Sequence, residues 1–475
     1  ASQINYSGEF NEYNIDFRHP FIEIDNNKCI LCARCIRICD EVVGASALGF
    51  VNRGFKTYVA PSLGASLLET SCESCGLCIS TCPTGAITEN YYFKPGPIKY
   101  EQAYTICNYC SIGCKIELNH KNGFVFRVNG AKGQINSNTN ICGIAKFAYH
   151  HYNDNKRITK PLIKKQGKFI PVSFEEALNL IAQSILNTLP NENGFFIGAR
   201  LTNEEMYLIQ KLARFVVKTN NISSFHYLER GKSYFTNSNK NVPFEELKNA
   251  SKFYVLGNNI FKNSPVLGYE LVNIKKIKNI PIKLISTQKD IQATNKANET
   301  FIIKNYYYFI KAVNHYLLSK NLENQLFIKD RCKGFDNYKD KLLTENFETL
   351  CEKAAISPNI IIEFAEDFNK EINAILIFSE NEITAAACTE IINLSMLTGK
   401  LGKTSTGIIA LKEKNNSHGL IDMGISPEYG VGAIKINNPK FIEKINNVLK
   451  ISNFTPSIIN NMKELLDNKM SKNIF

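Results

Sequence analysis

The chain has 475 residues, enough for two or three domains with a sizeable core. Apolar residues make up 44% and charged residues 21%, which excludes a disordered chain and a coiled coil. The net charge is +12, and no run of about 18 apolar residues marks a membrane-spanning helix. Because the chain begins with neither a secretory nor a transit signal, we expect a cytoplasmic protein without a membrane span.

Cysteines are gathered in the first third of the sequence. Of 15 cysteines, 12 lie between Cys29 and Cys142. A disulfide-rich secreted domain would be short and would carry an export signal, so this clustering favours metal binding.

The first two groups of cysteines each read CxxCxxCxxxC. This is the spacing of bacterial two-cluster ferredoxins, in which one tight loop supplies three thiolates to a 4Fe-4S cluster and the fourth cysteine goes to the other cluster. The sequence therefore predicts one cluster on Cys29, Cys32, Cys35 and Cys82, and a second on Cys72, Cys75, Cys78 and Cys39. Zinc and disulfides are the alternatives, which the duplicated spacing disfavours.

A third group follows at once, and consists of Cys107, Cys110, Cys114 and Cys142. The alternating stretch FVFRVNG between its members predicts a strand of a short sheet. The pattern alone could hold zinc, but its position after two predicted clusters favours a third 4Fe-4S cluster. Each cluster has four cysteines, so no iron is left open for substrate. We therefore predict that the three clusters carry electrons in series and that the chain has no catalytic residue. The alternative is that the clusters only stabilise the fold.

From about residue 160 the sequence alternates buried strands and helices. FEEALNLIAQSILNTL predicts an amphipathic helix, and FYVLG, IPIKLIS and AILIFS predict strands. A helix is predicted between the first two strands, at GYELVNIKKIK, and another after the third strand, at ITAAACTEIINLSML. This order of strands and helices predicts a parallel α/β sheet. No GxGxxG follows a strand, so NAD binding by this chain is not predicted, and the GNN after FYVL reads as an ordinary turn. Residues 440–475 read as helical segments broken at FTPS.

Three cysteines and a histidine pair fall outside these motifs. Cys332, Cys351 and Cys388 are isolated and read as buried structural thiols. His150 and His151 read as a surface pair.

With these motifs in place, the chain resembles the large subunit of NAD-dependent, molybdenum or tungsten formate dehydrogenases. It is also similar to the large iron-sulfur subunit of respiratory complex I. The resemblance rests on RHPFIEIDNNKCILCARC, ICGIAKFAYHHYN, RITKPLIKKQGKFIPVSFEEAL and LSMLTGKLGKTSTGI followed by NNSHGLIDMG.

The resemblance implies four parts. They are an α+β bacterial-type two-cluster ferredoxin domain over 1–100, a small 4Fe-4S β domain over 101–158, a degenerate molybdopterin-oxidoreductase-like α/β parallel-sheet domain over 159–425, and a helical segment over 426–475. The C-terminal domain of the family is not expected in this chain.

The sequence departs from the formate dehydrogenase pattern at four places. Glu229 and Arg230 stand where the family has its cysteine or selenocysteine metal ligand and a histidine. Ile144 replaces the lysine between cluster and pterin, although Lys146 is near. Ser286, Thr287 and Gln288 replace the acidic-Pro-Arg signature, and the chain ends at KNIF where relatives continue into a strand and further cofactor contacts. The resemblance then implies three 4Fe-4S clusters on a scaffold that has lost its molybdopterin. The family's N-terminal 2Fe-2S domain and His-plus-three-Cys site are not expected either, since His19 has no cysteine trio near it.

We therefore expect an electron-transfer subunit of a multisubunit NAD(P)H-linked oxidoreductase of hydrogenase, formate dehydrogenase or flavin-based electron-bifurcating type. The implied partners are a flavin- and NAD(H)-binding subunit and a thioredoxin-like 2Fe-2S subunit, with a hydrogenase or other catalytic subunit and ferredoxin as further candidates. The alternatives are a divergent molybdenum- or tungsten-pterin enzyme that uses Glu229 as its ligand, and a non-redox interaction module. The basic surplus is spread through helices and forms no arm with aromatic residues, so no nucleic-acid partner is expected.

Overall fold

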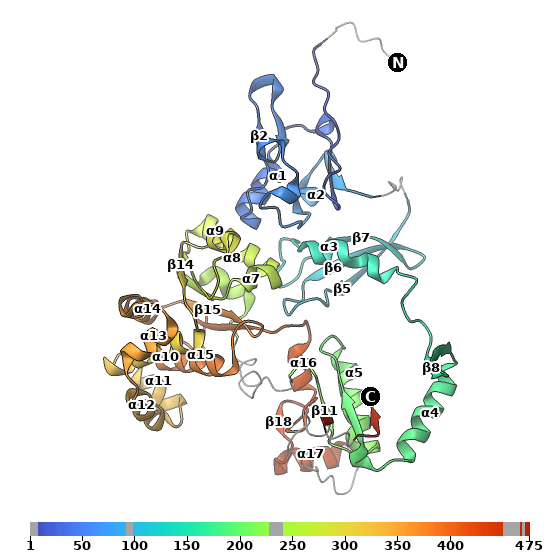
Figure 1. Cartoon of the computed structure of the whole chain (residues 1–475), viewed down its shortest axis with the longest axis vertical. Helices are drawn as coiled ribbons and strands as arrows, with labels where there is room; N and C mark the ends of the chain where they lie inside the picture. Colours follow the sequence, from blue (N-terminus) through green and yellow to red (C-terminus); the bar gives the residue numbers. More distant parts are fainter. Residues whose placement is uncertain (1–7, 92–97, 228–240, 450–465, 468–470) are drawn as a thin grey trace.

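The computed structural model describes residues 8–91, 98–227, 241–449, 466–467 and 471–475. Figure 1 shows four parts, the last of which is built from segments that precede and follow the third part in the chain. They are a cysteine-rich part at the N-terminal end, a small antiparallel sheet, a large α/β part and a smaller α/β part that contains the end of the chain. Among the described residues, no helix reaches the length and apolarity that crossing a bilayer requires.

The N-terminal part is held together by strands from its two ends. β1 (Ile22–Ile24) pairs antiparallel with β4 (Ile87–Glu89), and β2 (Gly49–Val51) pairs with β3 (Tyr58–Ala60). Two short helices, α1 (Arg34–Arg37) and α2 (Leu77–Thr81), each contain or adjoin one CxxCxxC loop. Its small apolar core includes Cys35 and Cys78, so the cysteines are part of what fills the interior.

The second part is a three-stranded antiparallel sheet followed by one short helix. Strands β5 (Glu101–Ile106), β6 (Lys115–Lys121) and β7 (Phe124–Gly130) pair in that order, and α3 (Gly143–Phe147) comes after the sheet. The strand predicted from FVFRVNG is confirmed, as is the short sheet.

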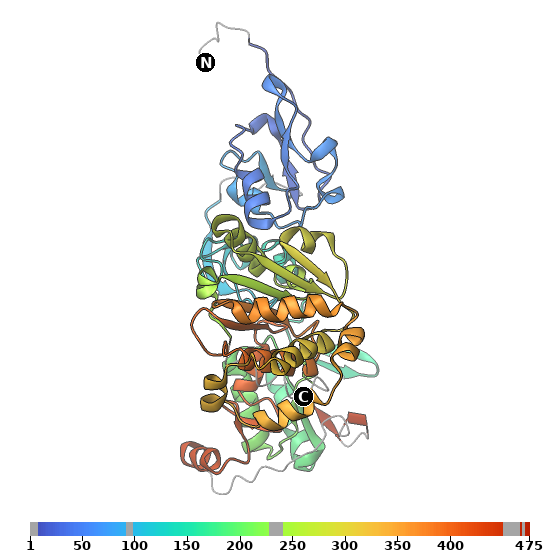
Figure 2. The same cartoon turned by 90° about the vertical axis from the view of Figure 1, so that its left-hand side faces the viewer.

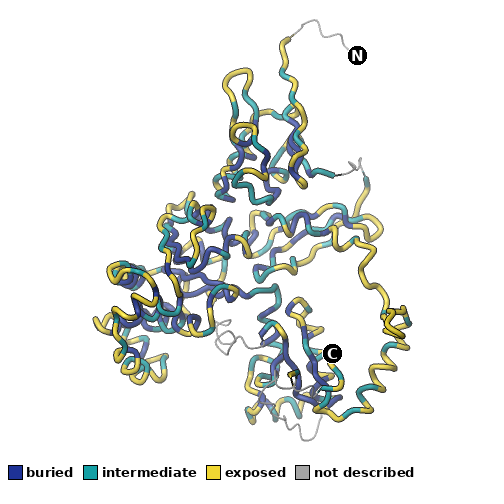
Figure 3. The backbone as a smooth tube through the Cα atoms, in the orientation of Figure 1, coloured by how far each residue is buried: buried dark blue, intermediate teal, exposed yellow. Residues whose placement is uncertain are grey.

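A hairpin and a helix then lead away from the sheet. They are β8 (Leu162–Lys165), β9 (Lys168–Pro171) and α4 (Phe174–Leu186), which begins where Ser173 Oγ accepts a hydrogen bond from Glu176 N at 3.1 Å. The predicted helix is present, but Leu178 is 62% exposed and Leu186 82%. Figure 3 shows this segment as largely exposed: no described residue of α4 is fully buried, and Ile185 near its end packs against the large core.

The large α/β part is built on five parallel strands in the order β14-β13-β12-β15-β16. The strands span Lys252–Leu256 (β12), Ile282–Ser286 (β13), Glu299–Ile302 (β14), Ala374–Ser379 (β15) and Gly407–Leu411 (β16). All three strands predicted in this region are confirmed. The order of strands reverses between β12 and β15, the place where α/β sheets usually bind ligands.

Helices cover both faces of this sheet (Figure 2). On the face nearer the cysteine-rich part lie α7 (Asn259–Asn263), α8 (Pro265–Lys278) and α9 (Ile291–Lys296). The other face carries α10 (Tyr306–Ser319), α11 (Gln325–Arg331), α12 (Phe335–Leu343), α13 (Phe347–Ala354), α14 (Pro358–Lys370) and α15 (Ala385–Leu397).

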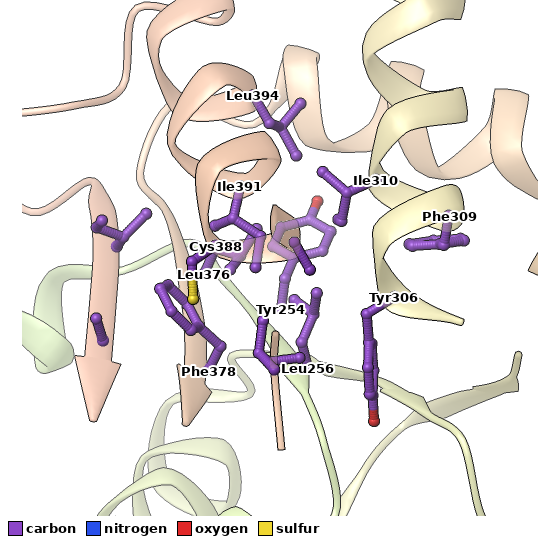
Figure 4. Packing of buried hydrophobic residues seen from close by; sticks show 14 of the residues in the cluster. Tyr254, Leu256, Tyr306, Phe309, Ile310, Leu376, Phe378, Cys388, Ile391 and Leu394 are labelled. Atoms are coloured by element: carbon purple, nitrogen blue, oxygen red, sulfur yellow. The ribbon is translucent and has the colours of Figure 1, made fainter. Parts of the chain in front are cut away.

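The large apolar core lies between β12, β15 and helices α10 and α15 (Figure 4). Cys351 and Cys388 are buried in it as predicted, whereas Cys332 is only half-buried at the end of α11.

The smaller α/β part corrects the prediction of a purely helical C-terminal segment. Its sheet has the order β11-β10-β19 and consists of β10 (Asn193–Phe196), β11 (Ile222–Ser223) and β19 (Asn473–Ile474), with α5 (Asn203–Lys211), α16 (Ser417–Asp422) and α17 (Pro439–Leu449) around it. A two-stranded hairpin, β17 (Tyr429–Gly430) and β18 (Ile434–Lys435), precedes α17. The last residues form a strand because β10 offers them a free edge, and Phe475 stacks on Phe195 at 5.0 Å. The FTPS segment lies outside the described residues.

Candidate metal centres

Four cysteines from opposite ends of the N-terminal part line one cavity. Cys29, Cys32 and Cys35 come from the loop before and into α1, and Cys82 comes from the end of α2. We call this set the first quartet.

A second cavity is lined by Cys39, Cys72, Cys75 and Cys78, the second quartet. Cys72, Cys75 and Cys78 belong to the loop at the start of α2, whereas Cys39 lies in a π-helical turn (Ile38–Val43) that continues α1. The structure thus places the fourth cysteine of each motif beside the first three of the other motif. This is the exchange of ligands that the ferredoxin spacing predicts.

The third quartet consists of Cys107, Cys110, Cys114 and Cys142. The first three lie on the loop between β5 and β6, which Cys107 N closes by donating to Cys114 O at 2.9 Å. Cys142 immediately precedes α3. Burial raises the pKa of Cys114, and the other three thiols of the quartet raise it further, so the four sulfurs lie within electrostatic reach of one another.

The backbone of the two ferredoxin loops is shaped alike. Leu31 and Ala33 have φ of 54° and 61°, and Ser74 and Gly76, two and four residues after Cys72, have φ of 52° and 69°. These left-handed residues turn amide groups toward sulfur: Leu31 N donates to Cys29 Sγ at 3.4 Å and Ser74 N to Cys72 Sγ at 3.4 Å. Successive amides that face one point favour a bound anion, which a thiolate-ligated cluster is.

The donor set fits an iron-sulfur cluster better than a single ion. Burial raises the pKa of Cys35 to about 11 and that of Cys75 to about 12, so ionising these thiols requires nearby positive charge, which iron supplies. A tetrahedral zinc site would bring its sulfurs within about 3.8 Å of each other. Among the described residues, no group of three or more His, Cys, Asp or Glu converges closely enough for one metal ion. The first and second quartets instead surround cavities.

The pKa of the Cys82 thiol is shifted in the opposite direction from those of Cys35 and Cys75. Burial opposes ionisation of its thiol, but the backbone amides of Ile87 and Thr84 outweigh that effect and lower the pKa of Cys82 below its usual value.

The three quartets follow one another without a gap. Cys35 of the first quartet and Cys78 of the second are buried in one apolar cluster, and Cys75 shares another with Cys114 and Cys142. Gly143 lies so close to the second loop that a Cβ atom there would overlap the carbonyl oxygen of Ser74. Backbone next to one quartet therefore touches backbone next to the following quartet.

A buried ion pair fastens α3 to the cysteine-rich part. Lys146 Nζ lies 3.4 Å from Glu89 Oε1 and donates to Ser80 Oγ at 3.3 Å, and Phe147 stacks on Phe21 at 4.9 Å. Lys146 is only 2% exposed. It points toward the ferredoxin-like part, so it is engaged elsewhere than in the role of the family lysine, whose position is taken by the partly exposed Ile144.

The α/β part packs against the second and third quartets through α8 and α9. Lys296 pairs with Glu73, and Lys276 Nζ lies 3.3 Å from Asp40 Oδ2. Between these parts lies a cavity of about 450 Å³ whose lining includes Cys72, Cys142 and Tyr269.

The carboxyl edge of the five-stranded sheet is closed by the chain itself. Glu382, which follows β15, sits so close to Gly257 after β12 that a Cβ atom there would displace its carboxylate. Its carboxylate accepts hydrogen bonds from Asn259 N at 3.1 Å and from the Tyr306 hydroxyl at 2.9 Å. A carboxylate of the protein thus occupies the crevice where the strand order reverses.

The loop after β13 joins the same network. Thr287 N donates to the Tyr306 hydroxyl at 3.2 Å, and Ser286 Oγ both donates to Gln288 O at 2.8 Å and accepts from Gln288 N at 3.1 Å. In Figure 4 the Tyr306 hydroxyl points away from the packed core. The polar groups of this loop are thus bonded to neighbouring residues of the chain at this edge. Glu229 and Arg230, the other predicted departures, lie outside the described residues.

The prediction for the histidine pair can be compared with the structure. His150 and His151 are exposed, which confirms a surface pair. His19, which has no role in the sequence analysis, is 2% exposed, and its Nε2 lies 3.0 Å from Ser74 Oγ in the second loop. Phe21 N donates to His19 Nδ1 at 3.1 Å, so Nε2 carries the proton and donates to Ser74. Neither this contact nor those of Glu382 and Tyr269 has a signal in the sequence, because each partner is distant in the chain.

These features define a protein with a ferredoxin-like part, a further cysteine site and a doubly covered parallel sheet. Family comparisons match the molybdopterin oxidoreductase description over residues 157–462, the molybdopterin oxidoreductase Fe4S4 domain over 101–154, and the ferredoxin-like domain of NADH-quinone oxidoreductase subunit 3 over 19–88. The chain belongs to the molybdopterin oxidoreductase family.

The relatives agree with this assignment. Two proteins named “Putative formate dehydrogenase” from different strains of Staphylococcus aureus are each 27% identical over 464 residues, which is 86% of this chain and 47% of theirs. The chain therefore spans about half the length of the curated relatives it matches. Among solved structures, acetylene hydratase from Pelobacter acetylenicus aligns with a TM-score of 0.51 at 14% identity, over 62% of this chain and 43% of that one, and shows the shared fold.

Proposed function

We propose that this chain is an electron-transfer subunit that relays electrons through three 4Fe-4S clusters. The observation that carries the proposal is the arrangement of three cysteine quartets one after another, from Cys32 at the exposed end to the third quartet, with members of neighbouring quartets buried in shared apolar clusters. When bound, each cluster would accept and pass on one electron at a time.

The chain's own residues would hold and insulate these groups. The left-handed loops direct amides at the thiolates, and the buried Lys146–Glu89 pair fixes the third site against the second. Since each proposed cluster has four cysteines, none offers an open iron to a substrate.

We further infer that the α/β part works without molybdopterin. This inference is supported by the carboxyl edge of the sheet, where the Glu382 carboxylate accepts hydrogen bonds from the backbone amide of Asn259 and from the Tyr306 hydroxyl. A phosphate group placed there would meet a carboxylate already in position, and like charges repel.

The proposed setting is a cytoplasmic, multisubunit NAD(P)H-linked oxidoreductase of hydrogenase, formate dehydrogenase or electron-bifurcating type. The resemblance of residues 19–88 to a subunit of NADH-quinone oxidoreductase supports such an assembly. The proposed partners are a flavin- and NAD(H)-binding subunit, a thioredoxin-like 2Fe-2S subunit and a further redox subunit. Ferredoxin is a further proposed partner, which would exchange electrons with the complex in solution.

Elemental analysis and EPR of the native complex, purified without oxygen through a tag on this chain, test the proposal. We expect about 12 iron atoms per chain, three 4Fe-4S signals after reduction, and neither molybdenum nor tungsten in stoichiometric amount. NADH or NADPH should reduce the clusters in the complex but not in the separated chain. Iron near zero, or clusters that no pyridine nucleotide reduces in the complex, would contradict the relay.

Family membership favours one other candidate, a pterin-dependent catalytic subunit with Glu229 as metal ligand. About one molybdenum or tungsten per chain, together with extractable pterin, would establish that candidate in place of the relay.

A further inference from the structure

One side chain of the α/β part reaches into the space between the second and third quartets. Tyr269 lies on α8, is 1% exposed, and lines the 450 Å³ cavity together with Cys72 and Cys142. Its hydroxyl lies within hydrogen-bonding reach of Cys75, a member of the second quartet, and both residues are buried in the same apolar cluster. Tyr269 thus comes from a helix outside the ferredoxin-like part yet contacts a predicted ligand of that part.

The position of Tyr269 is fixed from several sides. α8 packs against the π-helical turn that carries Cys39, where Val272 contacts Gly44. Ion pairs of Lys296 with Glu73 and of Lys276 with Asp40 flank the same contact. Because the helix is held on both sides, the hydroxyl meets Cys75 in a defined place.

The other aromatic side chains around the cavity differ from Tyr269. Phe21, Phe147 and Phe261 carry no hydrogen-bond donor, and Tyr109 lies on the loop of the third quartet with the Arg200 guanidinium 5.7 Å from its ring centroid. A phenol keeps its proton at physiological pH, so the Tyr269 hydroxyl can act as a donor.

A hydrogen bond to a cysteine ligand withdraws negative charge from the cluster, and so favours the reduced form, which carries one more electron. We propose that the Tyr269 hydroxyl donates a hydrogen bond to Cys75 and thereby raises the reduction potential of the cluster on the second quartet, so that the α/β part tunes the middle of the relay. Tyr269 is a positioning residue in this role, because it acts on the cluster through Cys75. The inference rests on the proposed function.

The test is the Tyr269→Phe variant of the whole complex, studied by redox titration with EPR detection. Loss of one charge-assisted hydrogen bond should change the ratio of reduced to oxidised second cluster about tenfold at a fixed potential, in favour of the oxidised form. The first and third clusters should be unchanged. Tyr254→Phe is the matched control: it removes a buried hydroxyl that donates to Asp367 at 2.9 Å, on the opposite face of the sheet.

A second measurement needs no variant. Wild-type complex grown with ring-deuterated tyrosine should show deuterium couplings in the EPR signal of the second cluster, and these should vanish in Tyr269→Phe. Absence of the couplings overturns the proposal, as does an unchanged potential in the variant. If Tyr269→Phe loses iron and Tyr254→Phe does not, the hydroxyl is needed to retain the cluster. That result would also overturn the proposal that it tunes the reduction potential. Failure of the relay itself is distinguishable, because the wild type would then lack the three signals.

Discussion

The buried pair Lys146–Glu89 gives the most direct test of how the third site is attached to the ferredoxin-like part. We predict that Lys146→Met weakens the attachment of α3 to β4. Breaking one partner of a buried ion pair costs about 3–5 kcal/mol, because the other charge stays buried without compensation. Here Arg127 still acts favourably on Glu89, so we expect the lower end, about 3 kcal/mol.

Hydrogen exchange measured by mass spectrometry reports this attachment locally. A loss of about 3 kcal/mol corresponds to roughly 100-fold faster exchange in the peptides that contain α3 and β4. The exposed Lys132→Met is the matched control and should exchange like the wild type. Adding Glu89→Gln to Lys146→Met removes the uncompensated carboxylate, so the double variant should regain most of the protection.

The effect also depends on pH in a defined direction. Burial raises the pKa of Glu89 even though Lys146 opposes the shift. The folded state therefore binds the Glu89 proton more tightly than the unfolded state, and stability falls as pH rises from the ordinary glutamate pKa to the raised one. Without Lys146 the pKa rises further, so the variant should be less impaired at pH 6 than at pH 8. Equal exchange in single and double variants, or no acceleration at all, would refute the buried ion pair as the fastening.

Three further outcomes are expected. Cys82→Ser should abolish the EPR signal of the cluster on the first quartet and leave the signal of the second cluster intact. Loss of only the second signal would disprove the crossed arrangement. The control variant Cys388→Ser, whose site is remote from all quartets, should retain every signal. Gly143→Ala should slow electron transfer from the second to the third cluster, seen by rapid-freeze EPR, because its Cβ collides with the Ser74 carbonyl; a wild-type rate would show that this contact is not needed. Glu382→Gln and Tyr306→Phe should each lower the thermal stability by about 1–3 kcal/mol, and non-additively, since they share one hydrogen bond; additive effects would argue against the network.

The sequence predicted the features whose signals are local. Ligand spacing is set within a few residues, so the three quartets and the exchange of Cys39 and Cys82 could be predicted from the sequence alone. Buried parallel strands are continuous apolar runs, and FYVL and AILIF appear as such in the structure.

Other features depend on partners far apart in the chain. Glu382 lies 125 residues after Gly257, and Tyr269 lies almost 200 residues after Cys75, so no local pattern connects them. The amphipathic pattern of α4 predicted a helix but not whether its apolar face would be covered. The strand at Asn473–Ile474 exists because β10 pairs with it, which a two-residue segment cannot reveal.

The exchange of cysteines has a consequence for biosynthesis. Each of the first two cavities draws on residues from both halves of the N-terminal part, so neither set of ligands is complete until the chain has emerged through Cys78 or Cys82. A bound inorganic core would then act as a cross-link that ties residues 29–39 to 72–82, and closing such a loop removes entropy from the unfolded chain. Cofactor insertion and folding of this part would be one event, timed after both motifs have left the ribosome.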